Sequence, residues 1–309
     1  MIPVKRYRKV RQTICFRIYF SLVLILMVPS AQTAPITFNT ALPVAKGEFL
    51  IRQQFISVQS GDDPGPTDRD RTAVTSTTAL VYGVNHKLAL FGILPYQDIE
   101  LSLNPGTGKL SRTNSGLGDV KLFGRYIFKQ NNQQGRTLRW AGFAGFKAPT
   151  GDEDARDSLG TLPPPVQTGT GSWDAFGGLV FTRQTLDWQL DAQLGYQTNT
   201  EANQYEAGDI FRFDASFQKR VWPRELSVGV PGFLYGVLEM NLIHQGKNKF
   251  NGVYDPHSNG TRLLLAPGIQ YVTRRWIAEA SLQLPVIQDL NGSALELGHI
   301  LRAGMRFNF

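Results

Sequence analysis

The last residues of the chain, ALELGHILRAGMRFNF at 294–309, alternate between two kinds of side chain. One face carries Leu297, His299, Leu301, Ala303, Met305, Phe307 and Phe309, and the other carries Gly298, Ile300, Arg302, Gly304, Arg306 and Asn308. A period of two indicates a β-strand with an apolar medium on one side. A strand of this length that ends in an aromatic residue is typical of the closing strand of an outer-membrane barrel, although an edge strand of a soluble sandwich has the same period.

Eleven further segments repeat this period and separate the two alternatives. In three of them, at 119–128, 187–198 and 208–222, charged or amide side chains point to one side and apolar side chains to the other. A dry sandwich core does not suit so many unpaired charges, because burying them costs free energy. The sequence therefore predicts an all-β fold, a transmembrane antiparallel β-barrel of about 12 strands. The strands are expected near 48–58, 72–82, 87–101, 119–128, 138–148, 172–182, 187–198, 208–222, 233–245, 260–272, 276–285 and 296–309.

The connections between these segments alternate in length. Those at 59–71, 102–118, 149–171, 199–207, 246–259 and 286–295 are long, whereas 83–86, 183–186 and 273–275 are short. Connections alternate in this way in outer-membrane barrels, where external loops are long and periplasmic turns are short. The connections 129–137 and 220–232 are longer than the rule expects. The final segment should close the barrel against 48–58.

The first residues have the layout of a secretory signal peptide. Six basic residues within 1–17 precede an apolar run at 18–28 and then small residues, which predicts a leader at 1–34 with cleavage within 30–34, and a single barrel at 35–309. Removing six positive charges from a formal net charge of +7 leaves +1, so the chain has no basic excess for nucleic acid. The single cysteine, Cys15, lies in the leader, so no disulfide is expected in the mature barrel.

The polar face of the strands supplies the candidate pore-lining residues. Two interpretations stay open: these side chains set the selectivity of a pore, or they pair with one another and fill a narrow lumen. The residues are Lys121, Arg125, Gln189, Asp191, Gln193, Arg212, Asp214, Glu239, Asn241, Glu279, Gln283, Arg302 and Arg306.

Other chemistry finds less support in the sequence. The acids Asp152, Glu153, Asp154 and Asp157 lack the spacing of a calcium loop, and no phosphate loop, zinc pattern or dinucleotide fingerprint occurs, so we expect no metal, cofactor or enzymatic activity. Two couples, Asp255 with His257 and Asp68 with Asp70, resemble the acids of outer-membrane proteases, but such residues are common in turns. His299 lies on the same face of the last strand as Leu297 and Leu301, which is the face expected to meet lipid. This position argues against a lipase, which would need a serine nucleophile near a histidine on adjacent strands.

Four motifs resemble one known family. They are FNTALPVAKGEF at 38–49, GLGDV at 116–120, FKAPTG at 146–151 and GTGSWD at 169–174. They are similar to the outer-membrane family named for the MetA pathway of phenol degradation. The resemblance implies a bacterial outer-membrane transporter akin to channels for hydrophobic compounds, and no catalytic residues come with it.

The function expected from the sequence is therefore passive uptake or efflux of small molecules, with hydrophobic or aromatic solutes as the candidates. A structural or adhesion barrel with a plugged lumen is the alternative from another class, and an outer-membrane hydrolase is a third. The expected partners are outer-membrane lipid, the solute, and the barrel-assembly machinery, which would bind the strand that ends in Phe309. No nucleic-acid partner is expected.

Overall fold

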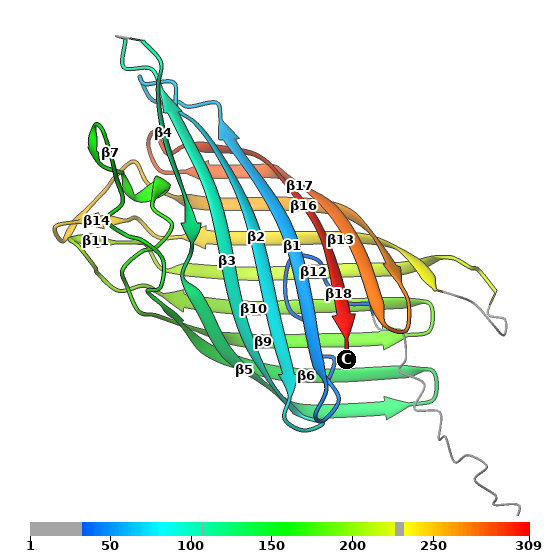
Figure 1. The fold of residues 1–309 in the computed structure, drawn as a ribbon. Helices are drawn as coiled ribbons and strands as arrows, with labels where there is room; N and C mark the ends of the chain where they lie inside the picture. The colour runs from blue at the N-terminus through cyan, green and yellow to red at the C-terminus, as the bar shows by residue number, and fades with distance from the viewer. Residues whose placement is uncertain (1–32, 107, 226–231) are drawn as a thin grey trace, which may run out of the picture. The chain divides into compact units, whose positions relative to one another are not determined.

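The computed structural model describes residues 33–106, 108–225 and 232–309, and their long strands form one closed antiparallel barrel (Figure 1). The predicted fold class is confirmed, with twelve wall strands in the described part of the chain. They are β1 (Phe49–Gly61), β2 (Asp70–Gly83), β3 (Leu88–Leu103), β5 (Val120–Gln133), β6 (Arg136–Ala148), β9 (Asp174–Thr185), β10 (Trp188–Thr198), β12 (Ile210–Trp222), β13 (Phe233–Gln245), β16 (Gly260–Val272), β17 (Trp276–Leu290) and β18 (Glu296–Asn308).

The barrel closes between its first and last strands. β18 pairs with β17 on one side and with β1 on the other, as the alternation at the end of the sequence predicts. At the short-turn end, the amide of Phe309 donates to the carbonyl of Phe49 at 2.9 Å, and the amide of Phe49 donates back at 3.2 Å. Closure leaves no free edge at this seam, and free strand edges are what a membrane barrel must avoid.

Two connections differ from the expectation. The region 102–118, expected to be a loop, contains β4 (Leu110–Leu117), which pairs with β3 alone among the described strands. The region 129–137, expected to be a long turn, is mostly strand, because β5 and β6 extend to Gln133 and Arg136 and leave a two-residue turn with Gly135 at a φ of +76°. Residues 129–137 are mostly polar, so the alternation of apolar and polar residues that marks the other strands is weak in this region.

Small elements decorate the long-loop end. They are β7 (Arg156–Asp157), β8 (Gly160–Thr161), the 3-10 helix η1 (Pro164–Val166), β11 (Tyr205–Glu206), β14 (Lys249–Phe250) and β15 (Val253–Tyr254). The loop that carries η1 folds inward: Leu162 and Val166 are buried against Ala73, Ile99 and Leu101. This loop, whose prolines Pro163, Pro164 and Pro165 stiffen it, therefore packs on the inner side of β2 and β3.

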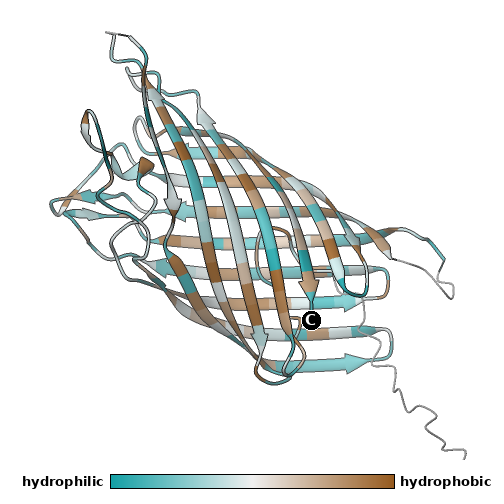
Figure 2. Cartoon of the chain, viewed as in Figure 1, coloured by the Kyte–Doolittle hydropathy of each residue, from teal (hydrophilic) through white to brown (hydrophobic). Residues whose placement is uncertain are grey.

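The wall follows the predicted alternation. On β10, Leu190 and Leu194 are 37% and 44% exposed, whereas Gln189 and Asp191 are 1% and 0% exposed. Hydrophobic and hydrophilic segments alternate along the wall strands in Figure 2. Among the described residues, no helix is both long and apolar enough to cross a membrane. An apolar outer face over a polar interior is what a barrel in lipid requires.

Candidate solute pathway

The residues that precede β1 lie inside the barrel. We call residues 33–42 the inner segment, and Figure 1 shows it in dark blue behind the strands of the near wall. The carboxylate of Glu239 on β13 accepts hydrogen bonds from the amides of Ile36 at 2.8 Å and Thr37 at 3.0 Å. Thr40 donates to Asp191 on β10 at 2.9 Å. Two neighbouring parts of the wall therefore hold one side of the segment.

Other strands hold the inner segment from other directions. Arg125 on β5 donates to the carbonyls of Thr40 and Leu42. Arg52 on β1 donates to the carbonyl of Ile36 at 2.8 Å, and Gln270 on β16 donates to that of Ala34 at 2.6 Å. Because its contacts come from β1, β5, β10, β13 and β16, the segment occupies the lumen between opposite walls.

Apolar contacts add to these hydrogen bonds. Ala41 is fully buried in a cluster with Ile127, Ala141 and Val180, and Phe143 packs against this cluster. Ile36 is 1% exposed. Side chains of the inner segment are therefore packed against the inner wall as well as hydrogen-bonded to it, as in a close-packed protein interior.

The candidate pore-lining residues all lie on the inner face of the barrel. Ten of them are buried: Arg125, Gln189, Asp191, Gln193, Asp214, Glu239, Asn241, Glu279, Gln283 and Arg306. The other three, Lys121, Arg212 and Arg302, are partly exposed on the same parity. That they line a conducting path stays a prediction.

Many of these polar side chains also pair with one another. Asp214 forms an ion pair with Arg212 at 3.0 Å and accepts hydrogen bonds from Asn241 at 2.8 Å and Gln193 at 3.2 Å. Gln283 donates to Asn241 at 2.7 Å. Residues that the sequence could only place on one face are thus connected across four strands. This pairing fits, in part, the interpretation that these side chains pair with one another and fill a narrow lumen.

A group of lumenal aromatic residues was missed by the sequence analysis. We call Phe91, Phe123, Phe143 and Phe176 the aromatic patch. The rings of Phe91 and Phe123 stack with centroids 4.4 Å apart, and Phe143 and Phe176 approach Phe123 edge-on at 6.2 and 5.7 Å. The one available signal was Phe123, which falls on the polar face of its strand between Lys121 and Arg125.

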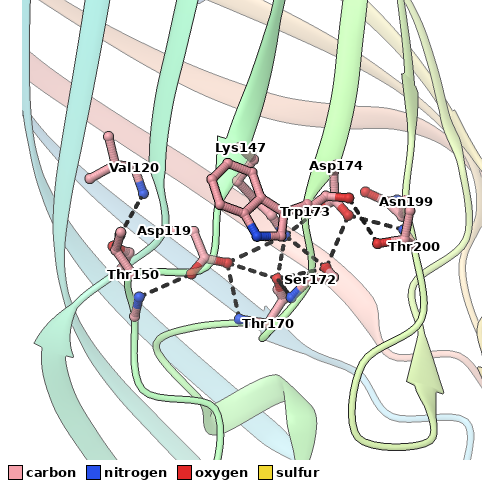
Figure 3. A network of polar contacts seen from close by, with 12 residues as sticks. Asp119, Val120, Lys147, Thr150, Thr170, Ser172, Trp173, Asp174, Asn199 and Thr200 are labelled. Carbon is pink, nitrogen blue, oxygen red and sulfur yellow. Dashed lines mark hydrogen bonds and ion pairs between the residues drawn. The ribbon is translucent and has the colours of Figure 1, made fainter.

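A buried ionic network lies where the loop that carries η1 joins the wall (Figure 3). Lys147 lies between Asp119, at 3.3 Å, and Asp174. Asp119 also accepts hydrogen bonds at 3.0 Å from the amides of Gly151 and Thr170, the two ends of the loop that carries η1. The network therefore fixes the base of that loop to the wall.

The residue couples considered for hydrolysis have turn geometry. Asp255 accepts a hydrogen bond from the amide of His257 at 2.9 Å, and the Nδ1 atom of His257 accepts from the amide of Ser293 at 3.0 Å. Asp68 has a φ of 45°. Asp255 and His257 thus accept hydrogen bonds from the backbone of their loops, and Asp70 is the first residue of β2. Within the described residues, no cluster of three His, Cys, Asp or Glu side chains is arranged to hold a metal ion.

The chain is similar to one known family and to solved structures. A family model described as "Putative MetA-pathway of phenol degradation" matches residues 60–284. The crystal structure of an outer membrane channel from Pseudomonas putida F1 is similar with a TM-score of 0.64 at 14% identity, over 90% of this chain and all (100%) of that one. The β domain of the Bordetella autotransporter BrkA gives a TM-score of 0.47 at 15% identity, over 85% and 100% of the two chains. A search of the curated proteins gives no match.

Proposed function

Because the chain belongs to the family of the MetA pathway of phenol degradation, whose model matches most of its barrel, we propose that it is a passive outer-membrane channel for small hydrophobic or aromatic solutes. The observation that carries the proposal is the aromatic patch on the inner wall. Four phenylalanine rings on the inner wall, beside the charged side chains of Lys121 and Arg125, offer a solute apolar contacts of the kind that recognise aromatic rings.

Passage through this barrel requires the inner segment to move. The segment is held by side-chain hydrogen bonds from several strands and by no ladder of strand pairing in the described residues. Such contacts can be exchanged for water one at a time, whereas a strand leaves the wall only when its whole ladder opens. Displacement of the segment therefore leaves the twelve-stranded wall intact.

The proposal is tested with outer-membrane vesicles that contain the full-length channel or none. Labelled toluene and a labelled disaccharide are added, and the initial rates of uptake are measured. We expect the channel to raise toluene uptake several-fold and to leave disaccharide uptake almost unchanged. Equal toluene uptake in both kinds of vesicle would reject the channel.

The alternative is a structural barrel with a permanently plugged lumen, and the burial of the inner segment favours it. The two functions differ in single-channel behaviour. A permanent plug gives no conducting events in planar bilayers at any voltage, whereas a displaceable segment gives discrete openings.

The buried contacts of Thr33 and Ala34 bear on processing of the chain. Residues 1–32, including most of the leader predicted at 1–34, lie outside the described residues. Thr33 donates to Gln189 at 2.8 Å, and the carbonyl of Ala34 is bound by Gln270. These contacts support cleavage before Thr33, towards the early end of the interval 30–34. Mass spectrometry of the amino terminus of the mature protein tests this; a chain that starts at Pro35 would contradict it.

Insertion of the barrel is expected to use the assembly machinery, with the strand that ends in Phe309 as its signal. Deletion of Phe309 should lower the amount of folded barrel in the outer membrane, measured by heat-modifiable mobility in gels. Folded yield equal to that of the wild type would contradict this role.

A further inference from the structure

We propose that the lumen between the inner segment and the loop end binds solutes that combine an aromatic ring with a carboxylate, that is, monoaromatic acids. The proposal rests on the proposed channel function and narrows its substrate class. It follows from the juxtaposition of the aromatic patch with Lys121, and from two further lumenal cations, Arg212 and Arg302.

The ring of such a solute has a surface to contact. Phe91, Phe143 and Phe176 are partly exposed although they point into the barrel, whereas Phe123 behind them is 7% exposed. Two glycines make room for the Phe143 ring: a methyl group at Gly178 would stand 2.8 Å from the tip of that ring, and one at Gly195 would stand 3.7 Å from it. The exposed parts of Phe91, Phe143 and Phe176 are therefore the surface that the ring of a solute can contact, edge-on or stacked.

The positive charge beside the patch belongs first to Lys121. Its ammonium group lies 5.9 Å from the centre of the Phe176 ring. Lys147, its register partner on β6, is neutralised by Asp119 and Asp174. Among the residues that the structure describes, Lys121 forms no ion pair. Lys121 thus offers a charge-assisted hydrogen bond to the carboxylate of a solute whose ring contacts Phe176.

Two arginines extend this positive surface across the lumen. Arg212 is the register partner of Gly195 and lies within electrostatic range of both Lys121 and Arg302. Arg212 forms an ion pair with Asp214 at 3.0 Å, and Asn241 and Gln193 also donate hydrogen bonds to that carboxylate. Arg302 donates through Nε to Gln283 at 2.7 Å and forms no ion pair within the described part of the chain. Lys121 and Arg302, each in range of Arg212, are therefore the two cations of this group that form no ion pair with a described residue, and each can attract an anion; the carboxylates of Glu239 and Glu279 also lie in range of Arg302.

The orientation of the solute follows from Arg125, at the other end of the patch. Arg125 lies over the ring of Phe91, 4.9 Å from its centre, but its guanidinium group already binds the carbonyls of Thr40 and Leu42. While the inner segment is in place, the carboxylate of the solute therefore points towards Lys121 and the loop end.

The test measures equilibrium binding to the purified full-length channel by isothermal titration calorimetry at pH 7. The probes are benzoate, its neutral analogue benzyl alcohol, and acetate, which has the carboxylate without the ring. We expect benzoate to bind at least about tenfold more tightly than either analogue. Lys121→Gln together with Arg302→Gln should remove that preference and leave the binding of benzyl alcohol unchanged.

Lys219→Gln serves as the matched control, because Lys219 lies on the outward face of β12, the strand that carries Arg212. It should leave all three affinities unchanged. Benzoate binding no tighter than that of benzyl alcohol, or a preference that survives the double substitution, would overturn the monoaromatic-acid proposal. Failure of the channel function itself has a different signature: toluene uptake equal in vesicles with and without the protein.

Discussion

Oε2 of Glu239 accepts two hydrogen bonds from Thr37, one from its amide at 3.0 Å and one from its hydroxyl at 2.6 Å. The carboxylate of Glu239, a residue that is 1% exposed, thereby accepts hydrogen bonds from the inner segment, which is not part of the wall. Hydrogen bonds to charged groups contribute about 1.5–3 kcal/mol each, so Glu239 is a main anchor of the inner segment.

Glu239→Ala should therefore release the inner segment while the barrel stays folded. We expect a higher open probability in planar bilayers, because the amides of Ile36 and Thr37 lose their acceptor. Glu100→Gln is the control, since Glu100 binds Ser111 at the long-loop end and does not touch the segment. Equal open probabilities for Glu239→Ala and the wild type would show that this anchor does not hold the channel closed.

A disulfide between positions 40 and 182 should lock the segment in place. The hydroxyl oxygens of Thr40 and Thr182 are 3.1 Å apart, which brings the two side chains within reach of a disulfide bond. The oxidised Thr40→Cys, Thr182→Cys protein should conduct less than the wild type, and dithiothreitol should restore the openings. The two single-cysteine variants control for reductant effects. Conductance that is insensitive to reductant after confirmed disulfide formation would rule out displacement of the segment as the opening step.

The two arginines of the closing strand give a test of the lumenal charge. Arg302→Glu together with Arg306→Glu should shift the reversal potential in a salt gradient towards cation selectivity. Arg306 contributes less, since it is 8% exposed and lies 4.0 Å from Glu279. Lys219→Glu, on the outward face, should leave the reversal potential unchanged. An unshifted potential in the double variant would mean that neither side chain lines the conducting path.

Lys147→Met should destabilise the loop end. It leaves Asp119 and Asp174 buried without their cation, and loss of one partner of a buried ion pair costs about 3–5 kcal/mol. We expect faster tryptic cleavage of the loop after Arg156 and a lower unfolding temperature. Adding Asp119→Asn and Asp174→Asn should recover part of the loss. If Lys147→Met alone matches the wild type in both assays, the network has no part in holding the loop.

The first external loop should respond to acid. Arg69 donates a hydrogen bond to Asp63 and, with further hydrogen bonds from the amides of Arg69 and Gly65, holds the pKa of Asp63 well below its ordinary value. A carboxyl with a depressed folded-state pKa stabilises the fold above its unfolded pKa, and this stabilisation is lost as pH falls below about 4. Amide exchange at Gly65 and Arg69, corrected for intrinsic rates, should rise over that range. Asp63→Asn should show raised exchange at neutral pH and no such dependence.

The strands were predictable because each side chain in a membrane barrel meets lipid or lumen. Leu190 and Asp191 show that contrast directly, and the predicted bounds of β13 and β16 agree with the structure. β4 was missed because its sequence, LSRTNSGL, contains few apolar residues. The strand also pairs along one edge only, with β3. The inner segment was not predicted, because the side chains that hold it come from five wall strands that only the closed barrel brings together. The aromatic patch depends on register: Phe91 and Phe123 become neighbours only through the pairing of β3 with β5.

The chain just before β1 limits how far the inner segment can travel. Gly47, at a φ of +80°, donates to the carbonyl of Gly83 at 2.7 Å, and the amide of Gly83 donates to the carbonyl of Glu48 at 3.0 Å. The root of the segment is thus tied to the turn between β2 and β3. A short tether keeps the effective concentration of a displaced segment near the millimolar range. Re-closure is then a first-order event, so an open lumen has a lifetime fixed by the chain itself.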